Sequence, residues 1–117
     1  MNIEDIRLYC LKKKGTNEGF PFGETTLVFK VLDKMFALLS LEGDNRINLK
    51  CDPERLITLK EHKNYVYPGY HMNKKYWMSV NFEQASSEEL KNWIDHSYDE
   101  VVRTLPIKKK EQLRNTD

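Results

Sequence analysis

The chain has 117 residues, of which 39% are hydrophobic, 11% aromatic and 32% charged, and its formal net charge is +1. This length is typical of one domain with its own core, and the aromatic content argues against a disordered chain. The near-balance of charge excludes a strongly basic nucleic-acid binder of the histone kind. The sequence contains no window of 18 apolar residues, so we expect no membrane span.

The N-terminus, Met1–Asp5, is acidic and lacks the basic-then-apolar pattern of a signal peptide. Two cysteines, Cys10 and Cys51, are too few for a disulfide framework. We therefore expect a cytoplasmic protein in which both cysteines act as small, buried hydrophobic residues.

The charges are segregated along the chain. Residues 1–14, 65–82 and 107–117 each carry an excess of two basic residues, whereas residues 83–104 carry six acidic residues against Lys91 and Arg103. A locally basic surface is therefore compatible with the small total charge.

The first expected element is a helix capped by Asn2 and ending with Lys12–Lys14. Acidic residues at its start and basic residues at its end suit the helix dipole. Ile3, Ile6 and Cys10 recur along one face at helical spacing.

Residues 16–24 read as a loop because Gly19, Pro21 and Gly23 interrupt any periodic pattern. Phe20 and Phe22 alternate within this loop, and we expect both aromatic side chains to anchor it to the core.

Three strand-like runs joined by short turns follow, which indicates antiparallel hairpins: Thr25–Val31, Met35–Leu41 and Arg46–Cys51. In the third run, Ile47 and Leu49 alternate with Arg46, Asn48 and Lys50. One face of that strand is expected to be buried and the other polar and hydrated.

Asp52 and Pro53 predict the N-cap and first turn of a helix that runs to about His62. Two further strands are expected at Tyr65–Tyr67 and Tyr76–Phe82.

The strongest helical pattern begins at Ser86, which forms a capping box with Glu89, and Pro106 ends it. After Pro106 the chain is basic and has little apolar content, so we expect residues 107–117 to form a mobile tail.

The expected order is α-β-β-β-α-β-β-α, an α+β fold in which helices cover one face of an antiparallel sheet in two layers. The sequence shows no internal repeat and no linker that would divide it. We therefore expect a single domain over residues 1–106.

Sequence motifs of known chemistry are absent: there is no glycine-rich phosphate loop, no G-x-S-x-G, no C-x-x-C and no H-E-x-x-H. His62, His71 and His96 are scattered rather than clustered at the spacing of metal ligands. We expect no metal, no cofactor and no enzymatic activity.

The segment with the richest chemistry is residues 66–77. Lys74 and Lys75 can contact phosphate oxygens, while Asn73 and His71 can contact phosphates or base edges. These four residues are the main candidates for a nucleic-acid-binding site.

Lys50 is a fifth candidate for phosphate contact, and Arg46 is expected on the same polar strand face. Tyr70 and Trp77 would support the hairpin, with Trp77 belonging more to the core than to the contact surface. An ordinary solvated strand face would also explain Lys50.

A purely structural reading of the hairpin stays open. In that reading Tyr67, Tyr70 and Trp77 fill the core, Asn73 makes the turn, and the lysines only solvate it.

Several of these stretches resemble the MmcQ/YjbR family of small bacterial proteins. The matching runs are Phe20–Gly23, Val28–Val31, Lys34–Leu38, Leu49–Glu54, Pro68–Lys75 with Trp77, Asp95–Tyr98 and Leu105–Pro106. The resemblance extends from about Ile3 to Lys108, and the run P-G-Y-H-M-N-K-K-x-W is its most specific part.

The resemblance implies a frataxin-like, double-wing α+β fold and DNA binding, with wings around residues 32–34 and 68–76. Frataxins bind iron through an acidic ridge on the first helix. Here that helix carries only Glu4 and Asp5 and is net basic, so iron binding is not expected.

Our functional expectation is a non-enzymatic DNA-binding protein that acts through the basic and aromatic hairpin and the adjacent sheet face. The alternative is a module that binds a protein or small ligand through the same aromatic residues. An enzyme would need His71, Lys74 and Tyr70 to converge on one pocket.

Overall fold

The computed structural model describes residues 1–116, which form one six-stranded antiparallel sheet and four helices. The strands lie in the order β1-β2-β3-β4-β6-β5. Their bounds are Thr16–Gly19 (β1), Thr26–Val31 (β2), Lys34–Ser40 (β3), Arg46–Lys50 (β4), Val66–Pro68 (β5) and Trp77–Asn81 (β6).

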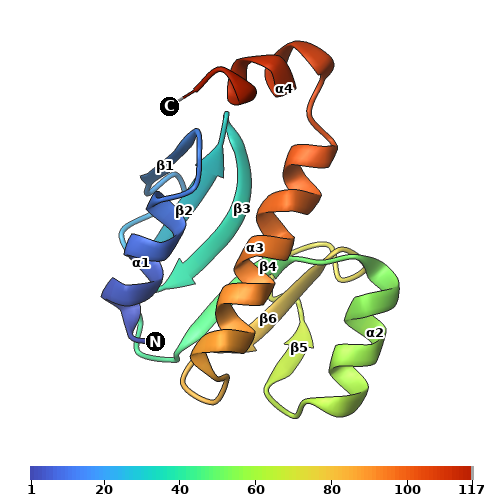
Figure 1. Cartoon of the computed structure of the whole chain (residues 1–117). Helices are drawn as coiled ribbons and strands as arrows, with labels where there is room; N and C mark the ends of the chain where they lie inside the picture. The colour runs from blue at the N-terminus through green and yellow to red at the C-terminus, as the bar shows by residue number, and fades with distance from the viewer. Residues whose placement is uncertain (117) are drawn as a thin grey trace.

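The helices are Ile3–Leu11 (α1), Pro53–His62 (α2), Ser87–Arg103 (α3) and Ile107–Arg114 (α4). Figure 1 shows α1 and α3 in front of the sheet and α2 beside β5. The predicted two-layer α+β fold is confirmed, and every predicted helix and strand is present with ends within about three residues.

The predicted capping signals act as expected. The Asn2 side chain accepts a hydrogen bond from the Asp5 backbone N–H, and Asp5 returns one to Asn2. Ser86 and Glu89 form the same reciprocal pair at the start of α3. Helix α1 ends at Leu11, however, so the lysines after it do not lie in its last turn.

The structure adds an edge strand that the sequence did not predict. Residues 16–19 were expected to be a loop, but they pair with β2 from Thr16 opposite Val31 to Gly19 opposite Val28. Backbone pairing at a sheet edge needs no apolar alternation, which is why the pattern was missed. Arg7 of α1 holds this strand by a bidentate ion pair with Glu18, at 2.7 Å for both hydrogen bonds.

The expected mobile tail is instead mostly helical, since residues 107–114 form α4. Leu113 is buried and anchors this helix against the α1–β1 connection. A Cβ atom on Gly15 would lie only 2.6 Å from Leu113 Cδ1, so the glycine makes room for the leucine. One apolar contact is too weak a pattern to predict from sequence, and Asp117, the last residue of that tail, lies outside the described residues.

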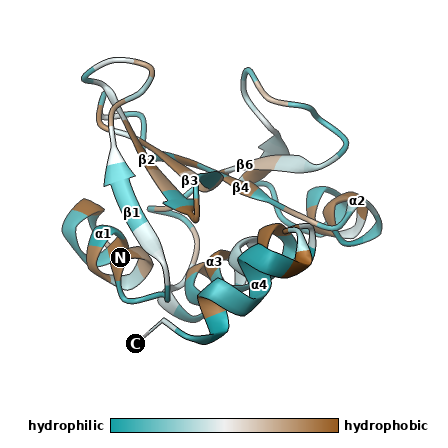
Figure 2. Cartoon of the chain, turned by 90° about the horizontal axis from the view of Figure 1, so that it is seen from above, coloured by the Kyte–Doolittle hydropathy of each residue, from teal (hydrophilic) through white to brown (hydrophobic). Residues whose placement is uncertain are grey.

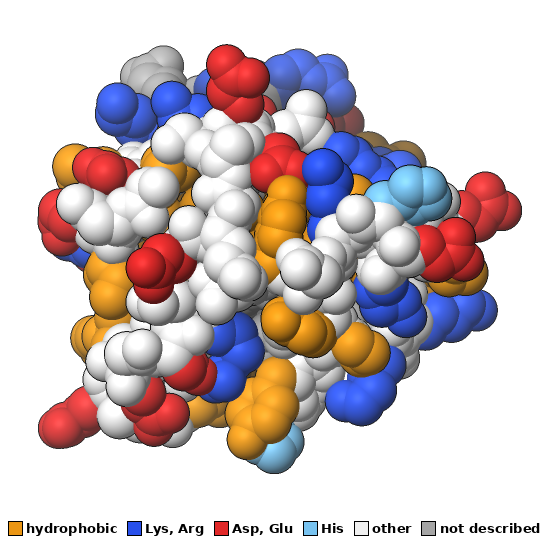
Figure 3. Space-filling model, turned by 90° about the horizontal axis from the view of Figure 1, so that it is seen from below, with side chains coloured by type: hydrophobic (Ala, Val, Ile, Leu, Met, Phe, Trp, Pro, Cys, Tyr) orange, Lys and Arg blue, Asp and Glu red, His pale blue; other side chains and the backbone are white. Residues whose placement is uncertain are grey.

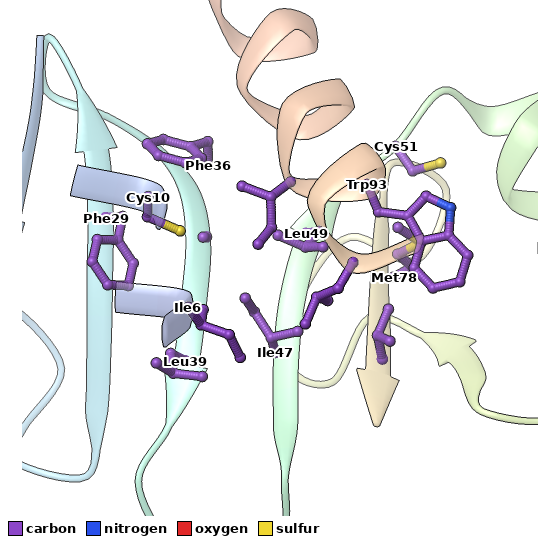
Figure 4. Packing of buried hydrophobic residues seen from close by; sticks show 14 of the residues in the cluster. Ile6, Cys10, Phe29, Phe36, Leu39, Ile47, Leu49, Cys51, Met78 and Trp93 are labelled. Atoms are coloured by element: carbon purple, nitrogen blue, oxygen red, sulfur yellow. The ribbon is translucent and has the colours of Figure 1, made fainter. Parts of the chain in front are cut away.

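The core lies between the sheet and the helices (Figure 4). The residues labelled there come from α1, α3, four strands (β2, β3, β4 and β6) and the link between β4 and α2. They are Ile6, Cys10, Phe29, Phe36, Leu39, Ile47, Leu49, Cys51, Met78 and Trp93. The predicted burial of both cysteines and of one face of β4 is therefore confirmed.

Polar contacts join α1 and the residues directly after it to α3. The Asp95 carboxylate accepts hydrogen bonds from the Tyr9 hydroxyl at 2.7 Å and from Lys13 Nζ at 2.5 Å. The Tyr98 hydroxyl donates to the backbone oxygen of Lys14 at 2.6 Å. Two residues of the Asp95–Tyr98 motif thus stabilise the fold.

Candidate nucleic-acid interface

Two loops rise from the sheet on the side opposite the helices. Figure 2 shows these loops, residues 20–25 after β1 and residues 69–76 before β6, on either side of the helix-free face. The resemblance placed one wing at residues 32–34, but Leu32 and Asp33 form a tight turn with φ of 44° and 73°. Loop 20–25, rather than this turn, flanks the face opposite loop 69–76.

Loop 69–76 is fastened to the sheet by a small polar network. Asn48 of β4 lies opposite Ser79 of β6 and accepts a hydrogen bond from its hydroxyl. Asn48 Nδ2 donates to the Tyr70 backbone oxygen at 3.0 Å, and the Tyr70 backbone N–H donates to Ser79 Oγ at 2.9 Å.

This network corrects one expectation about β4. Its Arg46-Asn48-Lys50 face was expected to be hydrated, but Asn48 is only 6% exposed because the loop covers it. A buried polar pair that is fully satisfied holds the loop in one position.

The turn at the tip of the loop uses two of the predicted site residues. Asn73 Oδ1 accepts a hydrogen bond from the Lys75 backbone N–H at 3.0 Å, so this side chain shapes the turn. Lys74 Nζ donates to the Gly69 backbone oxygen at 3.1 Å, which leaves two of the three ammonium protons for another partner. Lys75 Nζ lies 5.3 Å from the centre of the Tyr76 ring.

The structure brings Lys50 to the end of this loop. Lys50 lies directly opposite Trp77 in the β4–β6 ladder, and both side chains are half-buried. Within residues 1–116, no carboxylate lies within ion-pairing distance of Lys50, Lys74 or Lys75.

His71 and Tyr70 form the part of the loop nearest to β4. His71 adopts a left-handed backbone conformation with φ of 57°, which is uncommon for a residue other than glycine. Its ring centre lies 4.0 Å from that of Tyr70. The Arg46 guanidinium also lies over the Tyr70 ring, 4.3 Å from its centre. Arg46 forms an ion pair with Asp44 as well.

A cleft of about 260 Å³ lies between the two loops on the helix-free face. Strands β2, β3 and β4 form its floor, and the loops form its walls. The residues that line it are Phe22, Thr26, Leu38, Ser40, Arg46, Asn48, Tyr70, His71 and Met72. Sequence reasoning did not find this cleft, because its lining comes from five separate segments.

The aromatic residues of loop 20–25 also differ from expectation. Phe20 and Phe22 were expected to be anchored in the core, but they are 50% and 64% exposed. The polar network of Asn48 and Ser79 secures loop 69–76, whereas nothing comparable pulls loop 20–25 onto the sheet in the described chain.

Surface charge is unevenly distributed despite the net charge of +1. Figure 3 shows one end of the molecule, where acidic side chains predominate on the left and basic side chains on the right. Charge is therefore unevenly distributed on this face of the folded chain.

His96 lies on α3, contacts the residue that caps α2, and serves the fold. Its Nε2 accepts a hydrogen bond from the Asp52 backbone N–H at 3.1 Å, which requires the unprotonated nitrogen. Burial lowers the pKa of His96 below its ordinary value of 6.5; Arg55 adds to this, whereas Glu100, Asp52 and Asp99 oppose it.

A pH-dependent stability follows from this histidine. The folded state binds fewer protons here than the unfolded state, so the stabilisation is complete above about pH 6.5 and is lost as the pH falls below it. We expect urea titrations to show a lower free energy of unfolding at pH 5.5 than at pH 7.5, and a smaller difference in His96→Gln, which cannot titrate. An equal pH effect in both proteins would assign it to other groups.

Residues 1–116 contain neither a cluster of metal-ligating side chains nor a helix that could cross a membrane. In that part of the chain, no three His, Cys, Asp or Glu side chains converge to hold a metal ion. None of the described helices has the length and apolar character needed to cross a membrane.

Comparison with known proteins identifies relatives along nearly the whole chain. The uncharacterised protein YbdF of Escherichia coli O157:H7 is 39% identical over 97 residues, covering 81% of this chain and 80% of that protein. The uncharacterised protein YjbR of Escherichia coli K12 is 29% identical over 116 residues, covering 97% of this chain and 98% of that protein.

A solved structure matches the fold as well. The crystal structure of the Deinococcus radiodurans protein DR2400, with its DUF419 domain, has a TM-score of 0.86 and 35% sequence identity. The match covers 96% of this chain and 87% of that one. A family model described as YjbR matches residues 11–100. The chain therefore belongs to the YjbR family.

Proposed function

We propose that this protein binds DNA through loop 69–76 and the adjoining helix-free face of the sheet. The observation that supports the proposal best is that Lys74 and Lys75 lie in this loop, that Lys50 pairs with Trp77 directly after the loop, and that no carboxylate of residues 1–116 lies within ion-pairing distance of any of the three. Cations that form no ion pair within the protein can neutralise phosphates without first breaking one.

The roles of the candidate residues follow from their surroundings. Lys74, Lys75 and Lys50 would contact phosphates, and the exposed His71 and the Asn73 amide would contact phosphates or base edges. Tyr70 and Trp77 hold the loop in place. Helix α4 would add only diffuse attraction, screened within about 8–10 Å at physiological salt.

Removing two of the three cations should weaken binding without unfolding the protein. For the wild type, we expect a plot of the logarithm of DNA affinity against the logarithm of salt concentration to have a slope near −3. For Lys74→Ala/Lys75→Ala, we expect a slope near −1. The double variant should lose about tenfold or more in affinity at about 50 mM salt. Fluorescence anisotropy with labelled duplex and single strands measures both quantities.

The matched control is Lys12→Ala/Lys14→Ala, which removes the same charge from exposed lysines that follow α1 on the helix side. This control should keep the wild-type slope. Loss of binding in the control, or an unchanged slope in the loop variant, would place the DNA elsewhere. Absence of binding to any DNA at low salt would end the proposal.

We further propose that binding is not accompanied by catalysis. Burial raises the pKa of the Cys10 thiol to about 12 and that of Cys51 to about 11, so neither is a thiolate nucleophile near neutral pH. His96 is engaged by a backbone N–H. Both cysteines are free, which supports a reducing, cytoplasmic setting.

The alternative, a protein partner, would use the exposed aromatic side chains but would not need the lysines. A partner captured with equal yield by wild type and Lys74→Ala/Lys75→Ala, and retained after nuclease treatment, would favour that alternative over DNA.

A further inference from the structure

The exposed aromatic side chains of residues 1–116 lie in or beside the two loops that flank the helix-free face, although Tyr76 also lines a hollow beside the end of α3. Four of them belong to the two loops: Phe20, Phe22, Tyr70 and Tyr76. The fifth, Tyr67, lies on β5 opposite Ser79 and shares its side of the sheet. Of the exposed aliphatic residues, Leu8, Ile57 and Ile107 lie on helices and Leu41 directly follows β3. Aromatic rings that face water on one side of a protein provide stacking surfaces for bases.

The cleft between the loops is small and nearly uncharged. Its volume of about 260 Å³ is below the range of about 300–1,000 Å³ that is usual for small-molecule pockets. Phe22 forms one wall and Tyr70 the other, with Leu38 of β3 on the floor. This shape suits one flat ring system and is too small for a base pair.

The charges around the cleft indicate whether a ring bound there would carry an anionic or a cationic chain. Among residues 1–116 no carboxylate lines the cleft, and Arg46, which pairs with Asp44 outside the lining, is the one permanently charged lining group. Lys74 follows His71 by three residues, so their Cα atoms are at most about 11 Å apart. The acidic residues Glu42 and Asp44 lie in the β3–β4 turn, so an anionic chain would leave the cleft toward the lysines.

We propose that the cleft receives one unpaired base of a single-stranded nucleic acid, while the neighbouring phosphates lie on Lys74 and Lys75. This inference rests on the proposed function and adds to it the class of nucleic acid. A base inside a duplex is stacked and paired, so it cannot enter the cleft without being extruded.

The test compares three labelled probes of one sequence: a single strand of about 16 nucleotides, the corresponding duplex, and the single strand with abasic sites. We expect the wild type to bind the single strand about tenfold more tightly than the duplex. The abasic strand, which keeps every phosphate, should lose about tenfold relative to the intact strand.

Variants of Phe22 test whether the difference in affinity between the intact and the abasic strand arises in the cleft. Phe22→Leu should reduce affinity for the intact strand about tenfold and leave affinity for the abasic strand unchanged, whereas Phe22→Tyr should retain wild-type binding. Phe20→Leu is the matched control, because Phe20 lies in the same loop but does not line the cleft. Both positions are at least half exposed, so neither variant should change the melting temperature.

The outcomes separate the two proposals. Equal binding of duplex, intact strand and abasic strand, with a salt slope that depends on Lys74 and Lys75, would overturn the base-binding inference and keep the DNA-binding proposal. Equal losses in Phe20→Leu and Phe22→Leu would also overturn it, because stacking would then not involve the cleft. Binding to none of the probes would overturn both.

Discussion

Gly69→Ala is expected to lower the free energy of unfolding by about 2–3 kcal/mol, because the added methyl group has no space. A Cβ atom at this position would lie 2.7 Å from Trp77 Cβ and 2.8 Å from the Trp77 backbone oxygen. The Gly69 backbone N–H donates to that same oxygen at 2.9 Å. The chain cannot move away from Trp77 without breaking this hydrogen bond, and Trp77 is held in the sheet by its pairing with Lys50.

The substitution should also displace the loop that carries the proposed DNA contacts. The Gly69 oxygen accepts hydrogen bonds from the Met72 backbone N–H and from Lys74 Nζ. Urea unfolding monitored by circular dichroism measures the stability, and the anisotropy assay reports the loop. Gly19→Ala is the matched control, since nothing lies within 4 Å of its Cβ position. A Gly69→Ala protein as stable as this control would show that the loop adjusts freely.

Ser97→Ala is expected to cost about 2–4 kcal/mol, because it leaves two buried backbone groups without a partner. Ser97 is fully buried on α3, where its hydroxyl donates to the Phe36 backbone oxygen at 2.5 Å and accepts from the Lys50 backbone N–H at 2.8 Å. The β3–β4 register would place Phe36 opposite Lys50, but the ladder stops at the pair Ala37–Leu49. The hydroxyl therefore replaces a strand-to-strand hydrogen bond.

This gap in the ladder has a visible cause. The pairing of β2 with β3 shifts between Phe29 and Lys30, whose partners are Ala37 and Met35, so Phe36 is the extra residue of a bulge. A bulge bends its strand and interrupts the neighbouring ladder. Ser97 bridges the interruption and thereby also sets the position of the strand that ends in Lys50.

Chemical denaturation and amide hydrogen exchange test this role. The Lys50 amide proton should exchange faster in Ser97→Ala, because its acceptor is gone. Ser87→Ala, at an exposed position on the same helix, should change stability by no more than about 0.5 kcal/mol. A loss of similar size in both variants, or an unchanged exchange rate at Lys50, would contradict the bridging role.

The motif Asp95–Tyr98 illustrates how a conspicuous sequence can serve the fold. Asp95 joins α3 to α1, His96 accepts the Asp52 N–H at the start of α2, and Ser97 completes the sheet. These partners lie 44 to 86 residues away in the chain, and no local pattern reveals such contacts.

The candidate site could be predicted only in part. Residues 66–77 carry turn formers and lysines, so both the turn at Asn73 and its basic character could be read from the sequence. The position of Lys50 beside Trp77 could not, because it depends on which strands become neighbours. Likewise, only the folded chain shows that Asn48 is buried under the loop.

The sequence by itself determined the α+β class, the capped helices and the central strands, because helical and alternating periodicities are local consequences of backbone geometry. Only the tertiary structure decided that strand β1 forms one edge of the sheet, that Leu113 docks α4, and that two loops enclose a cleft. Each of these features depends on contacts between segments far apart in the chain, where a backbone edge or a single side chain leaves no periodic trace in the sequence.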